Sequence, residues 1–184
     1  MNFIIRQLAL DEIPKIGQID NSDVVDARYV CIPNTEGLGL SLQRVVVEPP
    51  EHEPNWGEEE LSCRYALWRR NVEEEGAVFF GAFVGDALAG VSLMTKFPDG
   101  QTAELYALHV DRQHRRQGLG AALMERVENQ CAAWDCAQLL TYTTLKASSL
   151  DFYRSRKFCV IGLQDPSVET KNFEVTLLKK LKQD

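Results

Sequence analysis

A short run of arginine and glycine at residues 115–120 has the composition of a phosphate-binding turn. The sequence before it, residues 103–110, predicts a strand, and residues 121–134 predict a helix with apolar side chains at helical spacing. The first N–H groups of a helix have no partner within the helix, and the helix dipole favours an anion there. Because glycine carries no Cβ, Gly118 and Gly120 would let a diphosphate approach the backbone.

Two common phosphate motifs do not match this run. A P-loop requires GxxxxGK followed by Ser or Thr, and the sequence contains no such stretch. A Rossmann fingerprint requires a third glycine near Leu123 and a strand–helix–strand start close to the N-terminus, and neither is found. The pattern that fits is [RQ]xxGx[GA], so the run resembles the acyl-CoA pyrophosphate loop of the GCN5-related N-acetyltransferases.

Further matches follow in the order that this family shows. Residues 138–145 are rich in β-formers, and residues 148–156 predict a short helix. Tyr153 in that helix falls on the position of the family's tyrosine. The resemblance extends over roughly residues 77–160 and predicts a single α/β domain with a mixed, mostly antiparallel sheet and helices on both faces.

The resemblance implies how acetyl-CoA, the family's co-substrate, would be held. The backbone near the end of the central strand would pair with the pantetheine arm, and the glycine-rich turn would bind the pyrophosphate. Arg115 and Arg116 would neutralise phosphate charge, although either could be a solvated surface arginine. The implied binding residues are Leu108, His109, Val110, Arg115, Arg116, Gln117, Gly118, Leu119, Gly120, Ala121, Lys146 and Tyr153.

Two lysines depart from the family pattern. Lys146 stands where the family usually has Asn, and Lys157 stands where it has the Gly of a Gly-Phe pair. A lysine at the first position could reach a phosphate, but it cannot accept a hydrogen bond as Asn can. These departures keep open an alternative function, a non-catalytic acyl-CoA-binding sensor or regulatory module.

Glu104 is the candidate general base. A positioned carboxylate can take the proton of an amine acceptor, directly or through water. Glu104 lies on the strand that leads to the loop, fourteen residues before Gly118, and the histone-acetyltransferase branch of the family has its base at this spacing. The alternative is a strand glutamate that faces solvent or pairs across the sheet. Tyr106, two residues further on, shares its face and could border the same site.

Tyr153 is the candidate general acid for the departing coenzyme A thiolate, by the role of the matching tyrosine in the family. The alternative is an amphipathic aromatic side chain at the edge of the core. A backbone N–H of His109 or Val110 would stabilise the oxyanion. No cysteine is placed as a nucleophile, so the resemblance implies direct acetyl transfer to a primary amine of a small molecule or peptide.

Composition limits the partners. A net charge of −7 argues against nucleic acid, and no apolar stretch has the ~20 residues of a membrane span. Five cysteines without a CxxC pair indicate reduced thiols in a cytoplasmic protein, and the three histidines show no metal-ligand spacing, so no metal is expected. Six glutamates between positions 48 and 60 form a solvated segment or attract a cationic acceptor. A homodimer remains open.

The whole chain of 184 residues is expected to form one N-acetyltransferase domain. Residues 1–76 would form the acceptor side, 77–164 the acetyl-CoA-binding core, and 165–184 a C-terminal strand. The layout of residues 19–50 also resembles that of streptothricin acetyltransferases. The expected elements are strands at 3–8, 38–47, 160–163 and 173–178, helices at 11–19 and 58–75, a hairpin of 77–84 and 87–97, an irregular segment at 20–34 and a proline-rich loop at 49–57.

Overall fold

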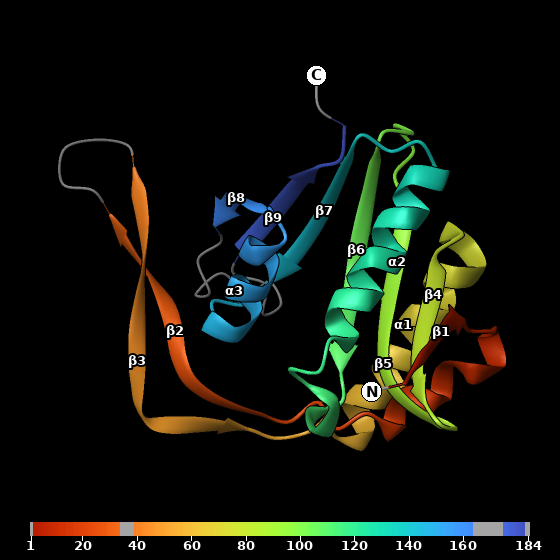
Figure 1. Cartoon of the computed structure of the whole chain (residues 1–184), viewed down its shortest axis with the longest axis horizontal. Helices are drawn as coiled ribbons and strands as arrows, with labels where there is room; N and C mark the ends of the chain where they lie inside the picture. Colours follow the sequence, from red (N-terminus) through yellow and green to blue (C-terminus); the bar gives the residue numbers. More distant parts are fainter. Residues whose placement is uncertain (1, 34–38, 164–174, 183–184) are drawn as a thin grey trace. The chain divides into compact units, whose positions relative to one another are not determined.

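A computed structural model describes residues 2–33, 39–163 and 175–182 (Figure 1). The chain forms two compact units. The first unit comprises Met1–Ser22, Pro54–Thr141 and Lys180–Asp184, and the second comprises Asp23–Glu53 and Tyr142–Lys179.

The first unit is built on a twisted sheet whose centre is an antiparallel meander. Strands β4 (Val78–Val84), β5 (Ala87–Lys96) and β6 (Thr102–Val110) follow one another in sequence and in space. Strand β1 (Ile4–Gln7) pairs antiparallel with β4 at one edge. Strand β7 (Gln138–Thr143) runs parallel to β6 on the other side.

Helices cover both faces of this sheet. Trp68 of α1 (Glu58–Glu75) packs edge-on against Phe79 of β4, with ring centroids 5.4 Å apart. The next residue, Phe80, lies under the guanidinium of Arg126 in α2 (Leu119–Ala133) at 5.0 Å. Because successive side chains of a strand point to opposite faces, α1 and α2 lie on opposite sides of the sheet, with α2 in front in Figure 1. The predicted α/β fold class is confirmed.

The face under α1 carries a continuous apolar core. The 3-10 helix η1 (Leu10–Gln18) adds Ile13 and Ile16 to it. Its buried members are Leu8, Ile13, Ile16, Ile19, Trp68, Ala77, Phe79, Phe83, Leu88, Val91, Leu93 and Ala107. On the other face α2 approaches β5 closely at Gly90, where a Cβ would meet Leu123 Cδ1 at 3.1 Å and the His109 carbonyl oxygen at 3.0 Å.

The second unit contains a long two-stranded ribbon. Strand β2 (Asp23–Pro33) pairs antiparallel with β3 (Leu40–Glu53). Helix α3 (Ala147–Ser155) and the antiparallel pair β8 (Cys159–Leu163) and β9 (Val175–Lys180) complete the unit.

Two predictions for the N-terminal part of the chain are wrong. Residues 20–34 are not irregular, because β2 occupies most of them. The proline-rich segment is not a loop up to residue 57, because β3 continues to Glu53. Pro49 and Pro50 lie where the register shifts, between the pairs Val46↔Ala27 and Glu51↔Val25, and there a residue that cannot donate to the ladder is tolerated.

Other boundaries differ by a few residues. The first helix is a 3-10 helix rather than an α-helix. Its N-cap residue is Ala9, whose N–H donates to the Glu12 carboxylate at 3.2 Å. Residues 38, 173 and 174 of two predicted strands lie outside the described residues.

Candidate active site

The turn that leaves β6 is held by Asp111. Its buried carboxylate accepts hydrogen bonds from the backbone N–H of Asp20 at 2.9 Å and of Gln113 at 3.0 Å, and it lies 3.1 Å from His114 Nδ1. The backbone N–H of Arg112 donates to the carbonyl of Asp20 at 2.9 Å. These bonds fix the short helix η2 (Arg112–His114) and the direction in which the chain reaches α2.

The predicted phosphate turn ends at the N-terminus of α2. Gly118 is the N-cap residue, with φ 92°, and Arg116 has φ 61°. Such left-handed conformations are uncommon outside glycine, so the backbone here is held in an unusual form. Among the described residues no side chain caps this helix end, and its first turn contains no acidic residue. The first N–H groups of α2 are therefore available to an anion.

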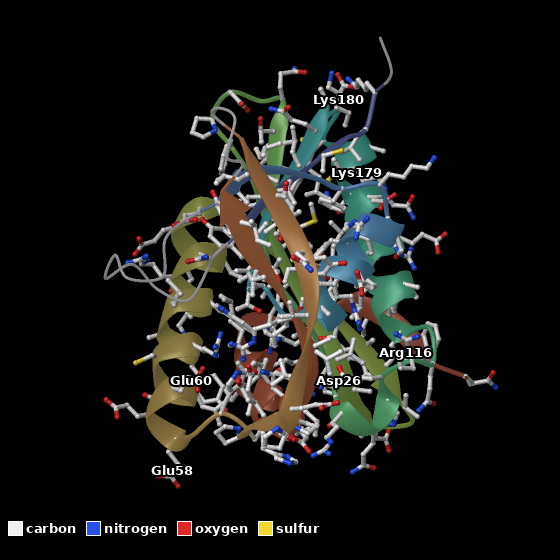
Figure 2. The ribbon with its side chains drawn as sticks, turned by 90° about the vertical axis from the view of Figure 1, so that its left-hand side faces the viewer. Asp26, Glu58, Glu60, Arg116, Lys179 and Lys180 are labelled. Carbon is white, nitrogen blue, oxygen red and sulfur yellow. The ribbon has the colours of Figure 1, made fainter. Side chains whose placement is uncertain are left out.

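The two arginines of the turn behave differently. Arg115 is half-buried and its Nε donates to the Val110 carbonyl at 3.0 Å, which ties the turn to the end of β6. Arg116 is exposed and lies on the segment that leads into α2 (Figure 2). Gln117 is exposed too, and its Nε2 donates to the Gln113 carbonyl at 2.7 Å.

The partners of β6 change along its length. Its register with β7 runs from Thr102↔Gln138 to Leu105↔Thr141, whereas its register with β5 continues to Gly90↔Val110. The predicted pantetheine-pairing residues, Leu108, His109 and Val110, lie beyond the last β7 pair and are half-buried.

Glu104 lies on the face of β6 that α1 covers. It pairs in register with Thr95 of β5, and only 7% of it is exposed. Burial, together with the nearby carboxylate of Glu75, raises the pKa of Glu104 to about 7. A hydrogen bond with Tyr106 acts in the opposite direction and lowers this pKa. A carboxylate with this pKa accepts a proton readily near neutral pH.

Glu75, the last residue of α1, was not singled out in the sequence. The hydroxyl of Tyr106 donates to its Oε2 at 3.1 Å, and the Thr95 hydroxyl donates to its backbone carbonyl at 3.2 Å. The structure thus brings Glu104 and Tyr106 together, as predicted from their spacing, and adds a second carboxylate. One feature of the sequence could have drawn attention to Glu75. Helix α1 ends in three glutamates without a basic residue, and negative charge is unfavourable at a helix C-terminus.

A buried amide lies one helical turn before Glu75. Asn71 is 2% exposed, and among the described residues its Oδ1 has no hydrogen-bond partner. Trp68, a further turn back, stacks on the His109 ring at 6.1 Å between centroids. Asn71 and Trp68 are the two fully buried side chains of α1, so Asn71 faces the sheet.

The remaining predicted site residues belong to the second unit. Tyr153 is buried, and its ring packs edge-on against Phe158 at 5.3 Å. Lys146 is the N-cap residue of α3, and its ammonium lies 2.6 Å from Glu53 and 3.7 Å from Asp23. A phosphate would have to compete with these two carboxylates, and the role of Lys146 stays a prediction.

The glutamate-rich segment is partly neutralised. Within the second unit Arg28 pairs with Glu51 and Lys146 with Glu53. In the first unit Arg64 pairs with Glu60 at 2.6 Å, and both Glu58 and Glu60 lie in the first turn of α1 (Figure 2). These pairs favour the solvated interpretation for most of the segment. The described residues contain no cluster of three metal-binding side chains and no helix that could span a membrane.

Comparison with known proteins points to one family. Residues 46–158 match the model of the acetyltransferase (GNAT) family. The structure is similar to a nourseothricin acetyltransferase, with a TM-score of 0.78 and 18% identity over 99% of this chain and 100% of that one. It is similar to a Bacillus anthracis protein described as a candidate streptothricin acetyltransferase in complex with acetyl coenzyme A (TM-score 0.75, 14% identity, 98% of each chain).

A third similar structure is the Escherichia coli ribosomal-protein-S18-alanine N-acetyltransferase, with a TM-score of 0.66 and 16% identity over 100% of this chain and 96% of that one. No curated protein sequence matches significantly. At these identities the structural likeness establishes the fold, and the family model supplies the assignment.

Proposed function

Because the chain belongs to the acetyltransferase (GNAT) family, we propose that it transfers the acetyl group of acetyl-CoA directly to a primary amine of a small molecule or peptide. The predicted family, enzyme class and co-substrate are confirmed, since members of this family are acetyltransferases that use acetyl-CoA. The proposal concerns the chemical class of the acceptor and the roles of the individual site residues.

Buried Glu104 is the observation that carries the proposal. A primary amine with a pKa near ~10.4 is only about 0.04% neutral at pH 7, so the reaction needs a group that removes its proton. Glu104 has a pKa of about 7, is shielded from bulk water, and stands on the strand that leads directly to the phosphate turn. It would take the proton from the ammonium group, which frees the nitrogen lone pair to attack the thioester carbonyl.

In this proposal the N-terminus of α2 binds the pyrophosphate. The N–H groups of Leu119, Gly120 and Ala121 would donate to its oxygens, with Arg115 and Arg116 supplying positive charge. Gly118 and Gln117 would shape the turn. The backbone of residues 108–110 would pair with pantetheine, and a His109 or Val110 N–H would stabilise the oxyanion. Tyr153 would protonate the thiolate.

The charges near Glu104 support a cationic acceptor. Glu75 and Glu104 place two carboxylates on the same face of the first unit. The Asn71 amide oxygen on that face accepts no hydrogen bond among the described residues. Two similar structures are named for acetylation of nourseothricin and streptothricin, so drugs of that type belong among the candidates, with polyamines and peptide amines. A cytoplasmic location and a homodimer remain expectations from the sequence.

The proposal is tested by thiol release from acetyl-CoA with a panel of amines. The panel contains a streptothricin, an aminoglycoside, a polyamine and a peptide with a free α-amino group, with the corresponding alcohols as controls. We expect release that depends on one class of amine. Binding of acetyl-CoA without release for any amine would instead support the sensor function.

A further inference from the structure

Two carboxylates share one phenol on the α1 face of β6. The hydroxyl of Tyr106 donates to Glu75 Oε2 at 3.1 Å. The same side chain forms a hydrogen bond with Glu104. Glu104 and Glu75 come from different elements, β6 and the end of α1, so the tyrosine links them across the interface between strand and helix.

The number of protons shared by Glu104, Tyr106 and Glu75 determines which of them donates each hydrogen bond. A phenol has one proton to donate, so with both carboxylates ionised it can satisfy only one of them. While Glu104 is ionised, the Tyr106 hydroxyl stabilises its carboxylate and lowers its pKa. Once Glu104 takes up a proton it can itself donate to Tyr106 Oη, and Tyr106 is then free to donate to Glu75 Oε2 at 3.1 Å. The hydrogen bond that Tyr106 donates to Glu75 is the one that this arrangement requires.

Exposure increases along the chain. Glu104 is 7% exposed, Tyr106 is 37% exposed, and Glu75 lies at the surface. The register neighbours of Glu104 are Thr95 on β5 and Leu140 on β7, neither of which titrates. Among the described residues, Glu75 and Tyr106 are the ionisable groups that act on Glu104. These two groups, whose exposure increases in the order Tyr106 then Glu75, offer a hydrogen-bonded route from Glu104 to water.

We propose that Tyr106 and Glu75 form a proton relay that carries the proton accepted by Glu104 to solvent. The relay rests on the proposed function, in which Glu104 deprotonates the acceptor amine. An N–H bond of the amine breaks as an O–H bond forms on Glu104. That proton then passes to Tyr106 Oη while the phenol's own proton passes to Glu75 Oε2, and Glu75 releases it to water. No oxidant or further reactant is needed.

The relay solves a problem that burial creates. Burial makes Glu104 a stronger base than a surface glutamate, but it also slows the loss of the proton that must leave before the next turnover. A hydrogen-bonded exit restores the carboxylate without opening the site to water. The raised pKa of Glu104 agrees with a proton that stays on the carboxylate until the relay removes it.

Tyr106→Phe and Glu75→Gln test the relay, with Glu74→Gln as the matched control. Glu74 is the exposed neighbour of Glu75 on the same helix, so its change removes an equal charge without touching Tyr106. The readouts are the pH profile of kcat/KM with an amine that supports thiol release, and the response of kcat to 1-methylimidazole, a proton acceptor with no N–H to acetylate.

We expect Tyr106→Phe to lower kcat about tenfold, and we expect added 1-methylimidazole to restore much of the loss. Glu75→Gln should move the rising limb of the pH profile to lower pH, because removal of a like charge lowers the pKa of Glu104. Glu74→Gln should behave as the unmodified protein. Calorimetry should give the same acetyl-CoA affinity for all variants.

Unchanged kcat in Tyr106→Phe, or a loss that the buffer base does not restore, would overturn the relay, since a structural tyrosine gives the second pattern. If Glu74→Gln shifts the pH profile as much as Glu75→Gln does, the shift comes from the loss of any negative charge at this end of α1. That result would also overturn the relay. Failure of the proposed function looks different, because the unmodified protein then releases no thiol with any amine.

Discussion

At the scale of single residues, Glu104 is the proposed general base. The sequence offered an ordinary strand glutamate as the alternative to a base, one that faces solvent or pairs across the sheet. The structure shows neither, since Glu104 is buried and its register neighbour is the uncharged Thr95. The sequence could not indicate why its pKa is raised, because both the burial of the carboxyl group and the nearby charge of Glu75 arise from the packing of α1 on β6.

Replacing Glu104 by Gln should lower turnover mainly near neutral pH. The variant cannot accept the amine proton, so its rate should recover partly at high pH, where more of the amine is already neutral. The unmodified protein should instead gain kcat/KM as pH rises through about 7, where Glu104 ionises. Steady-state rates from pH 6 to about 10 check this. A loss of equal size at every pH would make Glu104 structural.

The same substitution should change the pH dependence of stability. Glu104 has a pKa raised from 4.5 to about 7 in the folded state, so its stabilising effect is complete below pH 4.5 and is lost as pH rises through 7. Glu104→Gln removes this loss. The difference in free energy of unfolding between variant and unmodified protein should grow in favour of the variant by about 3 kcal/mol between pH 4.5 and pH 8.

Urea unfolding at those two pH values measures this difference. Other titrating groups are common to both proteins and cancel in the comparison. A difference that does not depend on pH would mean that Glu104 has an ordinary pKa, and the case for a neutral-pH base at this position would weaken.

Tyr153→Phe tests the proposed general acid. The ring should still pack against Phe158, and only the proton donor is lost. We expect turnover to fall about 10²-fold with little change in acetyl-CoA affinity, because in the proposed site the N-terminus of α2 would supply most of the binding energy. Rates and calorimetry on the same preparation separate these effects. Full activity in the variant would exclude the acid role and leave the family assignment intact.

At the scale of elements, the sequence predicted what local patterns encode. Helix α1 was predicted with both bounds correct, and Gly85-Asp86 does join β4 to β5 as a hairpin. Strand β2 was missed although Val25, Ala27 and Tyr29 alternate as buried residues along it. That period of two was readable in the sequence. The strand pairs along its length with β3 and forms one isolated bridge between Arg28 and Lys146.

The turn before α2 shows the same division. Its strand–turn–helix order was predicted from the sequence. The left-handed conformation of Gly118 was not predicted, although glycine permits it. The anchoring of the turn was not predicted either. Asp111 holds it through the N–H of Asp20, ninety-one residues away in sequence, and no local pattern reports such a bond.

Gly120→Glu tests the turn as an anion site. A negative side chain in the first turn of α2 should repel the diphosphate, and acetyl-CoA affinity should fall at least tenfold, about 1.4 kcal/mol. Gly57→Glu is the matched control, because Gly57 is the N-cap residue of α1 and a Cβ there meets nothing within 4 Å. Calorimetry should show a loss in the first variant alone. Unchanged affinity in a folded Gly120→Glu protein would refute the loop assignment.

At the scale of the whole molecule, the first unit carries the phosphate turn, the end of β6 and Glu104, while Tyr153 and Lys146 belong to the second unit. The predicted base and cofactor turn therefore rest on one sheet. The prediction of one domain over residues 1–184, with an acceptor side at 1–76, stays a prediction. It was based on the length of the chain and on the organisation of the family. Neither of these indicates how the parts of the chain pack.

The most direct test of the central claim follows the acetyl group itself. The protein is incubated at pH 7 with acetyl-CoA that carries an isotopic label in the acetyl group and with each amine of the panel, and the products are identified by mass spectrometry. We expect a labelled N-acetyl amine formed in equal amount to free coenzyme A, and much less of both with Glu104→Gln. Binding of acetyl-CoA with no labelled amine from any member of the panel would contradict it.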